Sequence, residues 1–226
     1  MRRFRTSMAV ALAATVMFIP TVAFPQTTPT TSSAGTGFDA TGYVAWLGGN
    51  RGGVGGDTFR DWFSTGLWGA GIGRYWTEHL KTEAEVTSTG RGTLVSFEQV
   101  PGAEPFSRAV YRNHAYRLHT LSLVQSYQFR HNAWVHPFAG AGLDIDWERR
   151  TTDGSVQSVD SVGDRIIVTS DPLPREEHTE VITRAVAIVG CKAYLARHAF
   201  LRTDVRASIH DRVDHVAWRF GLGWDF

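Results

Sequence analysis

The chain ends in VAWRFGLGWDF, residues 216–226, and this stretch alternates without interruption between two kinds of residue. One phase holds Val216, Trp218, Phe220, Leu222, Trp224 and Phe226, and the other holds Ala217, Arg219, Gly221, Gly223 and Asp225. A period of two residues is typical of a β-strand, in which successive side chains point to opposite faces. Large aromatics on the apolar phase, and an aromatic as the last residue, favour a strand that faces lipid.

The N-terminus predicts export. Arg2, Arg3 and Arg5 precede the apolar run Met8–Ile19, and the small-residue site Thr21-Val22-Ala23 predicts cleavage after Ala23. The apolar run is about half the roughly 20 residues that a membrane-spanning helix needs, and no later stretch is longer. We therefore expect a signal peptide over residues 1–23, a flexible lead-in over 24–38 rich in Thr, Pro, Ser and Gly, and one domain over 39–226.

The charge balance excludes some classes of partner. The chain has 23 basic and 22 acidic residues, and removal of residues 1–23 takes away three arginines, leaving 20 against 22. Without a basic excess, nucleic-acid binding has no electrostatic support. Cys191 is the only cysteine, so an internal disulfide is excluded.

Eight stretches of strand character divide the chain. They lie at about residues 41–47, 62–76, 80–89, 115–129, 135–148, 181–195, 200–209 and 216–226. Short turns follow the second, fourth and sixth stretches, and longer connections follow the first, third, fifth and seventh. We expect 90–113 to include a hairpin at Pro101-Gly102 and 149–179 to be a polar surface loop.

The fourth stretch changes phase. Tyr116 and Leu118 share one phase, whereas Leu121 and Leu123 share the other, which predicts a bulge near Thr120. An even number of strands joined alternately by short and long connections is the plan of a transmembrane barrel. Such a sheet must close, because an open edge cannot remain unpaired in lipid.

The last strand and the plan of the strands resemble those of a known family. A final strand ending in Phe226 resembles the assembly signal of Gram-negative outer-membrane β-barrels, and residues 39–226 resemble small barrels of the OmpA/OmpX kind. The predicted fold is all-β: a closed eight-stranded antiparallel up-and-down transmembrane β-barrel, preceded by a cleaved signal peptide. The resemblance implies the outer membrane of a Gram-negative-type bacterium, with outer-membrane lipid, periplasmic chaperones and the barrel-assembly machinery as partners. The predicted lipid face and assembly signal comprise Trp218, Phe220, Leu222, Trp224 and Phe226.

The opposite strand phase is charged. We expect an interior charge network of Lys81, Glu83, Glu85, Asp144, Asp146, Arg184, Arg202, Asp204, Arg206 and Arg219. Side chains nearly fill an eight-stranded barrel, and charges removed from water must pair with one another. A structural network of ion pairs is therefore the preferred interpretation, and a narrow ion pathway is the competing one.

No cofactor, metal or catalytic site is predicted. Gly66–Gly73 superficially resembles a dinucleotide fingerprint, but no buried strand precedes it and no helix pattern follows. Among nine histidines, His79, His131 and His198 fall in three separate turns, too far apart for one metal ion.

Three functions are compared. The preferred one is a non-enzymatic outer-membrane barrel with a structural or surface-interaction role. A lipid A-modifying enzyme is the second, because Ser208 and His210 lie near Asp211 and Asp214. In the lipid A deacylases that this plan resembles, His precedes Ser, and the order is reversed here. The third is a soluble periplasmic lipocalin-like barrel whose aromatics line a ligand cavity.

Overall fold

The structure, a computed structural model, describes residues 37–50, 62–100, 107–129, 134–162 and 165–226. The expected signal peptide, nearly all of the lead-in, the Pro101-Gly102 turn and His131 lie outside these ranges. Within them, no helix has the length and apolar character that a membrane crossing requires.

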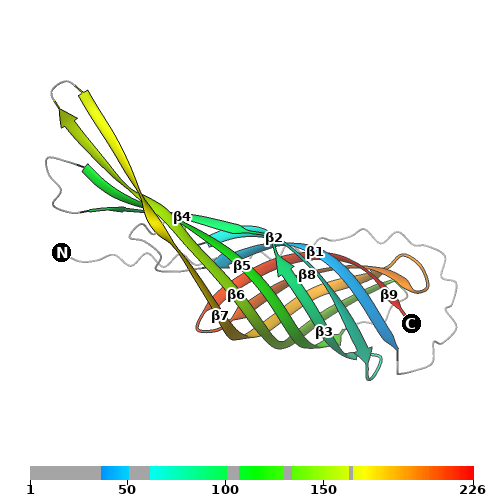
Figure 1. Ribbon diagram of the computed structural model, residues 1–226. Helices are drawn as coiled ribbons and strands as arrows, with labels where there is room; N and C mark the ends of the chain where they lie inside the picture. Colours follow the sequence, from blue (N-terminus) through cyan, green and yellow to red (C-terminus); the bar gives the residue numbers. More distant parts are fainter. Residues whose placement is uncertain (1–36, 51–61, 101–106, 130–133, 163–164) are drawn as a thin grey trace, which may run out of the picture. The chain divides into compact units, whose positions relative to one another are not determined.

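The described ranges form a single antiparallel sheet. Its nine strands are β1 Phe38–Asn50, β2 Trp62–Tyr75, β3 Leu80–Thr89, β4 Gly92–Gln99, β5 Ser107–Gln128, β6 Val135–Val162, β7 Arg165–Tyr194, β8 Ala199–Ile209 and β9 Val213–Asp225. β9 pairs with β1 from His215↔Gly49 to Asp225↔Asp39, and β3 pairs with β5. The hydrogen-bonded pairings therefore form a ring through β1, β2, β3, β5, β6, β7, β8 and β9 (Figure 1).

The described chain has nine strands, so the expected number of eight is wrong. β3 and β4 lie one after the other along β5, as the pairs Ser88↔His119 and Gly92↔Tyr116 show. Gly90 and Arg91 separate them, and Gly90 N donates to Gly66 O at 2.9 Å. β3 and β4 therefore lie in line beside β5, and together they count as one strand around the ring.

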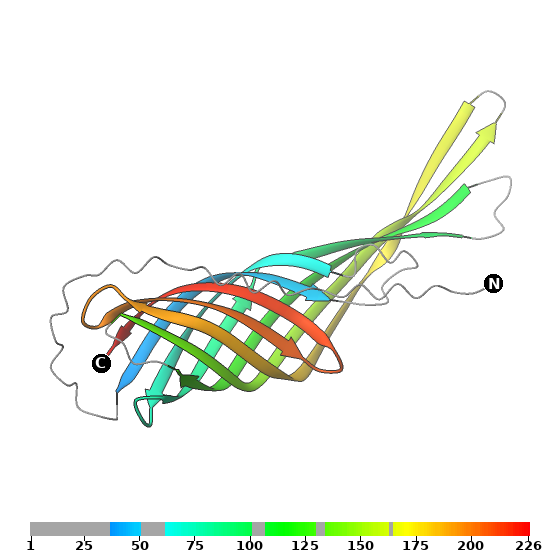
Figure 2. The same ribbon diagram turned by 180° about the vertical axis from the view of Figure 1, so that it is seen from behind.

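The expected loop over residues 149–179 is also wrong. β6 and β7 remain paired from the ring as far as Val162↔Arg165, with one register irregularity between Thr152 and Gly154. β5 follows β6 out to Ser107↔Val159, and β4 follows β5. We call the parts of β4, β5, β6 and β7 beyond the ring the sheet extension (Figures 1 and 2). The polar sequence of β7 did not predict this strand, because a strand that is exposed on both faces needs no apolar alternation.

The bulge expected near Thr120 is absent from the register of β5. β5 pairs with β3 and with β6 across this position without a shift. Tyr116 and Leu118 are buried, whereas Leu121 and Leu123 are exposed. Both sets are apolar because the interior also contains small apolar clusters, one of them formed by Phe63, Leu94 and Tyr116.

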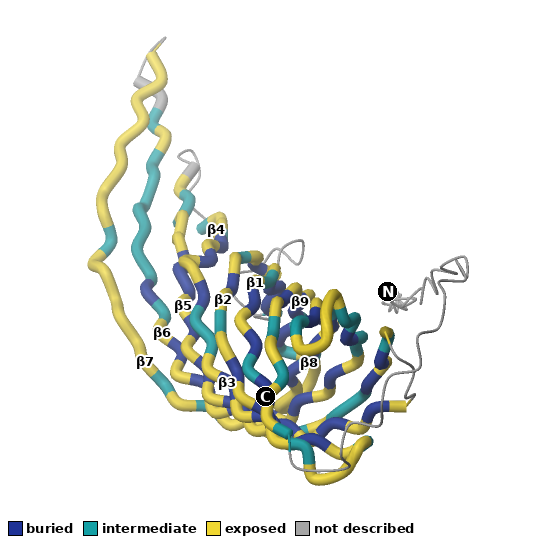
Figure 3. Tube along the Cα trace, turned by 90° about the vertical axis from the view of Figure 1, so that its right-hand side faces the viewer, coloured by how far each residue is buried: buried dark blue, intermediate teal, exposed yellow. Residues whose placement is uncertain are grey.

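Burial alternates along the ring strands, whereas β7 is exposed along most of its extension (Figure 3). All eight tryptophans are on the exposed phase, with exposed fractions between 42% and 64%: Trp46, Trp62, Trp68, Trp76, Trp134, Trp147, Trp218 and Trp224. The buried phase is rich in charge. The sheet is thus apolar on its outside and polar on its inside, the reverse of a soluble protein.

Candidate functional site: charged interior, outer surface and sheet extension

The ten residues predicted for the interior all lie inside the ring, and none is more than 6% exposed. Glu85 on β3 is at their centre. Its Oε2 accepts from Arg219 Nη1 at 2.7 Å and from Arg206, and Arg202 Nη2 lies 3.6 Å from Oε1. A carboxylate with three arginines around it is compensated for its loss of water.

Two further carboxylates extend this cluster toward the turn ends of the strands. Asp204 accepts from Arg202 Nε at 2.9 Å and from Arg219 Nε at 2.5 Å. Glu83 accepts from Arg202 Nη1 at 2.5 Å. Arg202 therefore bridges β3 and β8 across the interior.

A second cluster lies toward the extension. Asp146 accepts from Arg184 Nη1 at 2.6 Å and from Thr120 Oγ1 at 2.5 Å. Arg184 also donates to Asp214 at 2.9 Å. Asp144 belongs to the Glu85 cluster, because it accepts from both Arg206 and Ser208.

The third cluster includes residues that the sequence analysis missed. Lys81 and Lys192 both contact Asp39 Oδ2, at 2.8 and 3.2 Å, and Lys192 donates to Asp225 at 2.7 Å and to Tyr75 at 2.9 Å. Asp39 was assigned to the start of the domain rather than to a strand. Because β1 begins at Phe38, Asp39 shares the inward phase with Thr41 and Tyr43.

The interior is tightly filled where these clusters meet. A cavity of about 20 Å³ is lined by Asp144, Arg206 and Arg219 among others. This is room for about one water molecule. At this level, the interior is packed with side chains.

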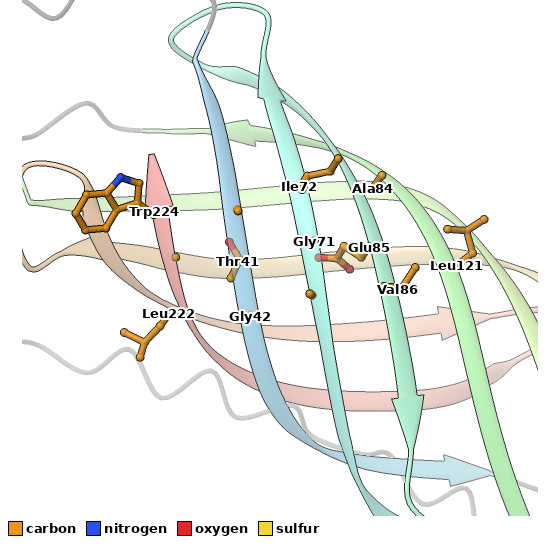
Figure 4. A pocket seen from close by; sticks show the side chains of 13 residues that line it. Thr41, Gly42, Gly71, Ile72, Ala84, Glu85, Val86, Leu121, Leu222 and Trp224 are labelled. Carbon is orange, nitrogen blue, oxygen red and sulfur yellow. The ribbon is translucent and has the colours of Figure 1, made fainter. Parts of the chain in front are cut away.

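The five residues predicted for the lipid face all lie on the outer surface: Trp218, Phe220, Leu222, Trp224 and Phe226, with exposed fractions of 50% to 75%. Beside them is a shallow hollow of about 680 Å³ (Figure 4). Leu222 and Trp224 lie at one border and Leu121 at the other, with Gly42 on the floor. The small floor residues leave space for apolar groups from outside.

Ser208 and His210 do not form a nucleophile and base pair. Ser208 is buried and donates to Asp144 Oδ2 at 2.9 Å. His210 is exposed, and its Nδ1 lies 3.2 Å from the Thr183 carbonyl oxygen. Ser208 is therefore part of the interior network, and His210 contacts the backbone of β7.

The described chain shows no group of three or more His, Cys, Asp or Glu side chains arranged to hold a metal ion. His79 Nδ1 lies 3.0 Å from the Gln128 carbonyl oxygen, and His198 stacks on Trp224 with ring centroids 5.9 Å apart. Each of these turn histidines thus has a local structural contact.

His114 connects three strands of the sheet extension. Its Nε2 lies 3.1 Å from Ser96 Oγ on β4, and its Nδ1 lies 3.1 Å from Thr152 Oγ1 on β6. Burial lowers the pKa of His114, and the nearby charges of Arg150 and Arg112 lower it further, against the opposing effect of Asp153. A neutral ring suits a position between two hydroxyl groups.

Comparison with known proteins gives a family match. The profile of the outer membrane protein beta-barrel domain matches residues 9–226. No curated protein matches the chain. Among solved structures, the N-terminal β-barrel domain of Pseudomonas aeruginosa OprF is similar at 13% identity and a TM-score of 0.49, covering 86% of this chain and 100% of that one.

Two further structures are similar. The attachment invasion locus protein Ail of Yersinia pestis has 10% identity and a TM-score of 0.48, with 86% of this chain and 100% of that chain covered. The outer membrane protein OprG of Pseudomonas aeruginosa has 10% identity and a TM-score of 0.48, with 86% and 98% covered.

Proposed function

The chain belongs to the outer membrane protein beta-barrel domain family and resides in the outer membrane of a Gram-negative-type bacterium, and from this premise we propose that it is a non-enzymatic anchor. It closes as a barrel with eight strand positions, spans the membrane, and holds the sheet extension outside the cell. Its role is structural or in surface interaction. The observation that carries the proposal is the inverted polarity of the ring, apolar outside and charged inside.

The apolar outside is suited to lipid. Tryptophans on the outer surface provide the amphipathic rings that favour membrane interfaces. Acyl chains of outer-membrane lipid would fill the hollow beside Leu222 and Trp224. In this proposal lipid is the partner of the ring surface along its whole circumference.

The direction of the barrel follows from its connections. Short turns such as Trp76–His79 and Leu195–His198 belong to the periplasmic end, and the sheet extension belongs to the outside. The strand Val216–Phe226 is then the assembly signal that the barrel-assembly machinery and periplasmic chaperones recognise. Delivery to the periplasm would use the signal peptide expected over residues 1–23.

The interior supports an anchor over the two rival functions. Buried ion pairs between Glu85, Arg206 and Arg219 fill the space that a lipocalin-like ligand would need. A lipid A-modifying enzyme would need Ser208 to be accessible to its base and substrate, and Ser208 is bonded to Asp144 inside the ring.

Cysteine labelling on intact cells tests the proposed direction. In a Cys191→Ser background, we expect Ile166→Cys at the tip of the extension to react with a membrane-impermeant maleimide. Arg197→Cys, in a short turn, should react only after the outer membrane is permeabilised. Reaction of Arg197→Cys on intact cells, or of Ile166→Cys only after permeabilisation, would contradict the proposal.

A further inference from the structure

One edge of the sheet extension is open. Between Arg165 and Asp171, β7 pairs with β6 only, and its pairing with β8 begins at Ala185. All seven residues from Arg165 to Asp171 are exposed. Alternate N–H and C=O groups of this segment therefore point away from the sheet, in the arrangement to which another strand adds.

The adjoining part of this edge, residues 172–177, carries features that hinder pairing. Pro172 and Pro174 follow the open segment directly, and Arg175, Glu176 and Glu177 come next. Prolines and charges are the usual protection of an exposed strand edge. By contrast, Ile166, Ile167 and Val168 are strongly β-forming and 75%, 47% and 60% exposed. The edge is thus unprotected over Arg165–Asp171 and protected over residues 172–177.

The open segment is complementary to itself. If two copies of RIIVTSD pair antiparallel about Val168, Arg165 of each copy lies opposite Asp171 of the other. Neither residue has an ion-pair partner in the described part of its own chain. Ile167 lies opposite Thr169, and both are β-branched, which favours cross-strand packing. The symmetric pair therefore gains an ion pair at each end of a β-branched centre.

We propose that Arg165–Asp171 binds the same segment of a second copy of this chain, displayed by a facing membrane. This inference rests on the proposed function, which puts the extension outside the cell. The two-fold axis of an antiparallel pair is perpendicular to the strands. Two copies in one membrane are related by an axis along the membrane normal, so both strands rise in the same direction along that normal and tilted strands cross instead of lying antiparallel. Only copies in facing membranes satisfy the antiparallel geometry at any strand tilt.

The other edge of the extension does not offer the same match. β4 is eight residues long, and antiparallel self-pairing about Ser96 sets Thr93 opposite Gln99, with no pair of opposite charges at its ends. A contact between β4 of one copy and β7 of the next would be heterologous and would not close. The β7 segment thus favours a closed pair. Each pair is short, so adhesion of two cells depends on many copies acting together.

Disulfide trapping between two cell populations tests the pairing. Each population displays the Cys191→Ser protein with its own epitope tag, and both carry Val168→Cys. At the two-fold axis the two Cα atoms lie roughly 4.5–5.5 Å apart, within disulfide range. We expect mixing and mild oxidation to give a dimer that carries both tags.

Ile166→Cys is the matched control, because Ile166 is at least as exposed as Val168 but lies about 13 Å from its own copy across the pair. It should give about a tenth of the mixed-tag dimer that Val168→Cys gives. Ile166→Cys on one population should instead be trapped by Ser170→Cys on the other, since these positions are opposite each other.

Charge reversal tests the ends of the pair. Arg165→Asp places like charges opposite each other at both ends and should lower the mixed-tag dimer about tenfold. Arg165→Asp combined with Asp171→Arg restores opposite charges and should restore the yield. An unchanged yield in Arg165→Asp would overturn the proposed register.

The outcomes separate this inference from the proposed function. If Val168→Cys reacts fully with impermeant maleimide on intact cells but gives no mixed-tag dimer, the extension is outside and the pairing is wrong. Crosslinks to a different protein in place of the mixed-tag dimer also overturn the pairing. If Val168→Cys is unreactive until permeabilisation, the proposed function fails first.

Discussion

Single interior residues take part in several buried ion pairs of the ring. Arg219 is 2% exposed and donates to both Glu85 and Asp204. Removal of one partner from a buried ion pair leaves charge that neither water nor protein compensates, which costs more than the pair itself contributes. The interior clusters should therefore be sensitive to single substitutions.

We predict that Arg219→Met lowers the free energy of unfolding by about 3–5 kcal/mol. The measurement is urea unfolding of the refolded protein in lipid bilayers. Arg197→Met, an exposed turn position, is the control and should change stability by about 0.5 kcal/mol or less. Equal stability of Arg219→Met and the unchanged protein would show that the interior network is not needed.

His114 makes the sheet extension sensitive to pH. Its pKa is lowered from the usual 6.5, so the folded extension prefers the neutral ring. Its contribution to stability is fully present above about pH 6.5 and is lost as the pH falls toward the folded pKa. Hydrogen exchange in β4, β5 and β6 should speed up between pH 7.5 and pH 5 relative to a His114→Asn variant. The same pH response in the variant would exclude His114 as the cause.

At the scale of strands, glycines differ in how closely the backbone of the neighbouring strand approaches them, and the sequence alone does not show this difference. A Cβ on Gly142 of β6 would collide with the Leu123 carbonyl oxygen of β5, whereas a Cβ on Gly42 would meet nothing within 4 Å. Gly42 lies on the outer face, in the floor of the hollow. A side chain at position 42 is therefore tolerated, whereas one at position 142 is not.

Gly142→Ala should force β5 and β6 apart and lower the free energy of unfolding by roughly 1–3 kcal/mol. Gly42→Ala should leave it within about 0.5 kcal/mol. Both variants are compared by urea unfolding in bilayers. An equal effect of the two substitutions would contradict the close packing of β5 against β6.

The strands of the ring were largely predictable, and those of the extension were not. Around the ring, one phase faces outward and the other faces packed charges, so Trp218 and Arg219 differ in kind at adjacent positions. Along the extension of β7 both faces are exposed, so a stretch such as residues 165–179 shows no alternation of buried and exposed residues. The bulge near Thr120 was predicted wrongly because Tyr116 and Leu118 are apolar residues on the inward phase. In the sequence, such residues look like a change of strand phase.

The charged interior was predictable as a set, but its pairings were not. Strand phase places Glu85, Arg206 and Arg219 on the inner face, whereas their contacts depend on the stagger of strands far apart in sequence. Asp39 was missed because β1 begins earlier than its apolar residues indicated. Asp39 lies two residues before Thr41, on the same inward phase of β1.

At the scale of the whole molecule, the first and last strands complete the ring. β9 pairs with β1 over eleven consecutive positions, from Gly49↔His215 to Asp39↔Asp225. Among the described strands the hydrogen-bonded ring is continuous, and an unbroken ring is the condition for a sheet to span lipid. The sheet extension can keep an open edge, because we propose that it lies outside the membrane.

The central claim is that the outer surface of the ring faces lipid, and tryptophan fluorescence in bilayers tests it most directly. All eight tryptophans are on that surface. We predict that lipids brominated in their acyl chains quench most of the emission, and that an aqueous quencher such as iodide has little effect. Strong quenching by iodide with no effect of brominated lipid would contradict the account.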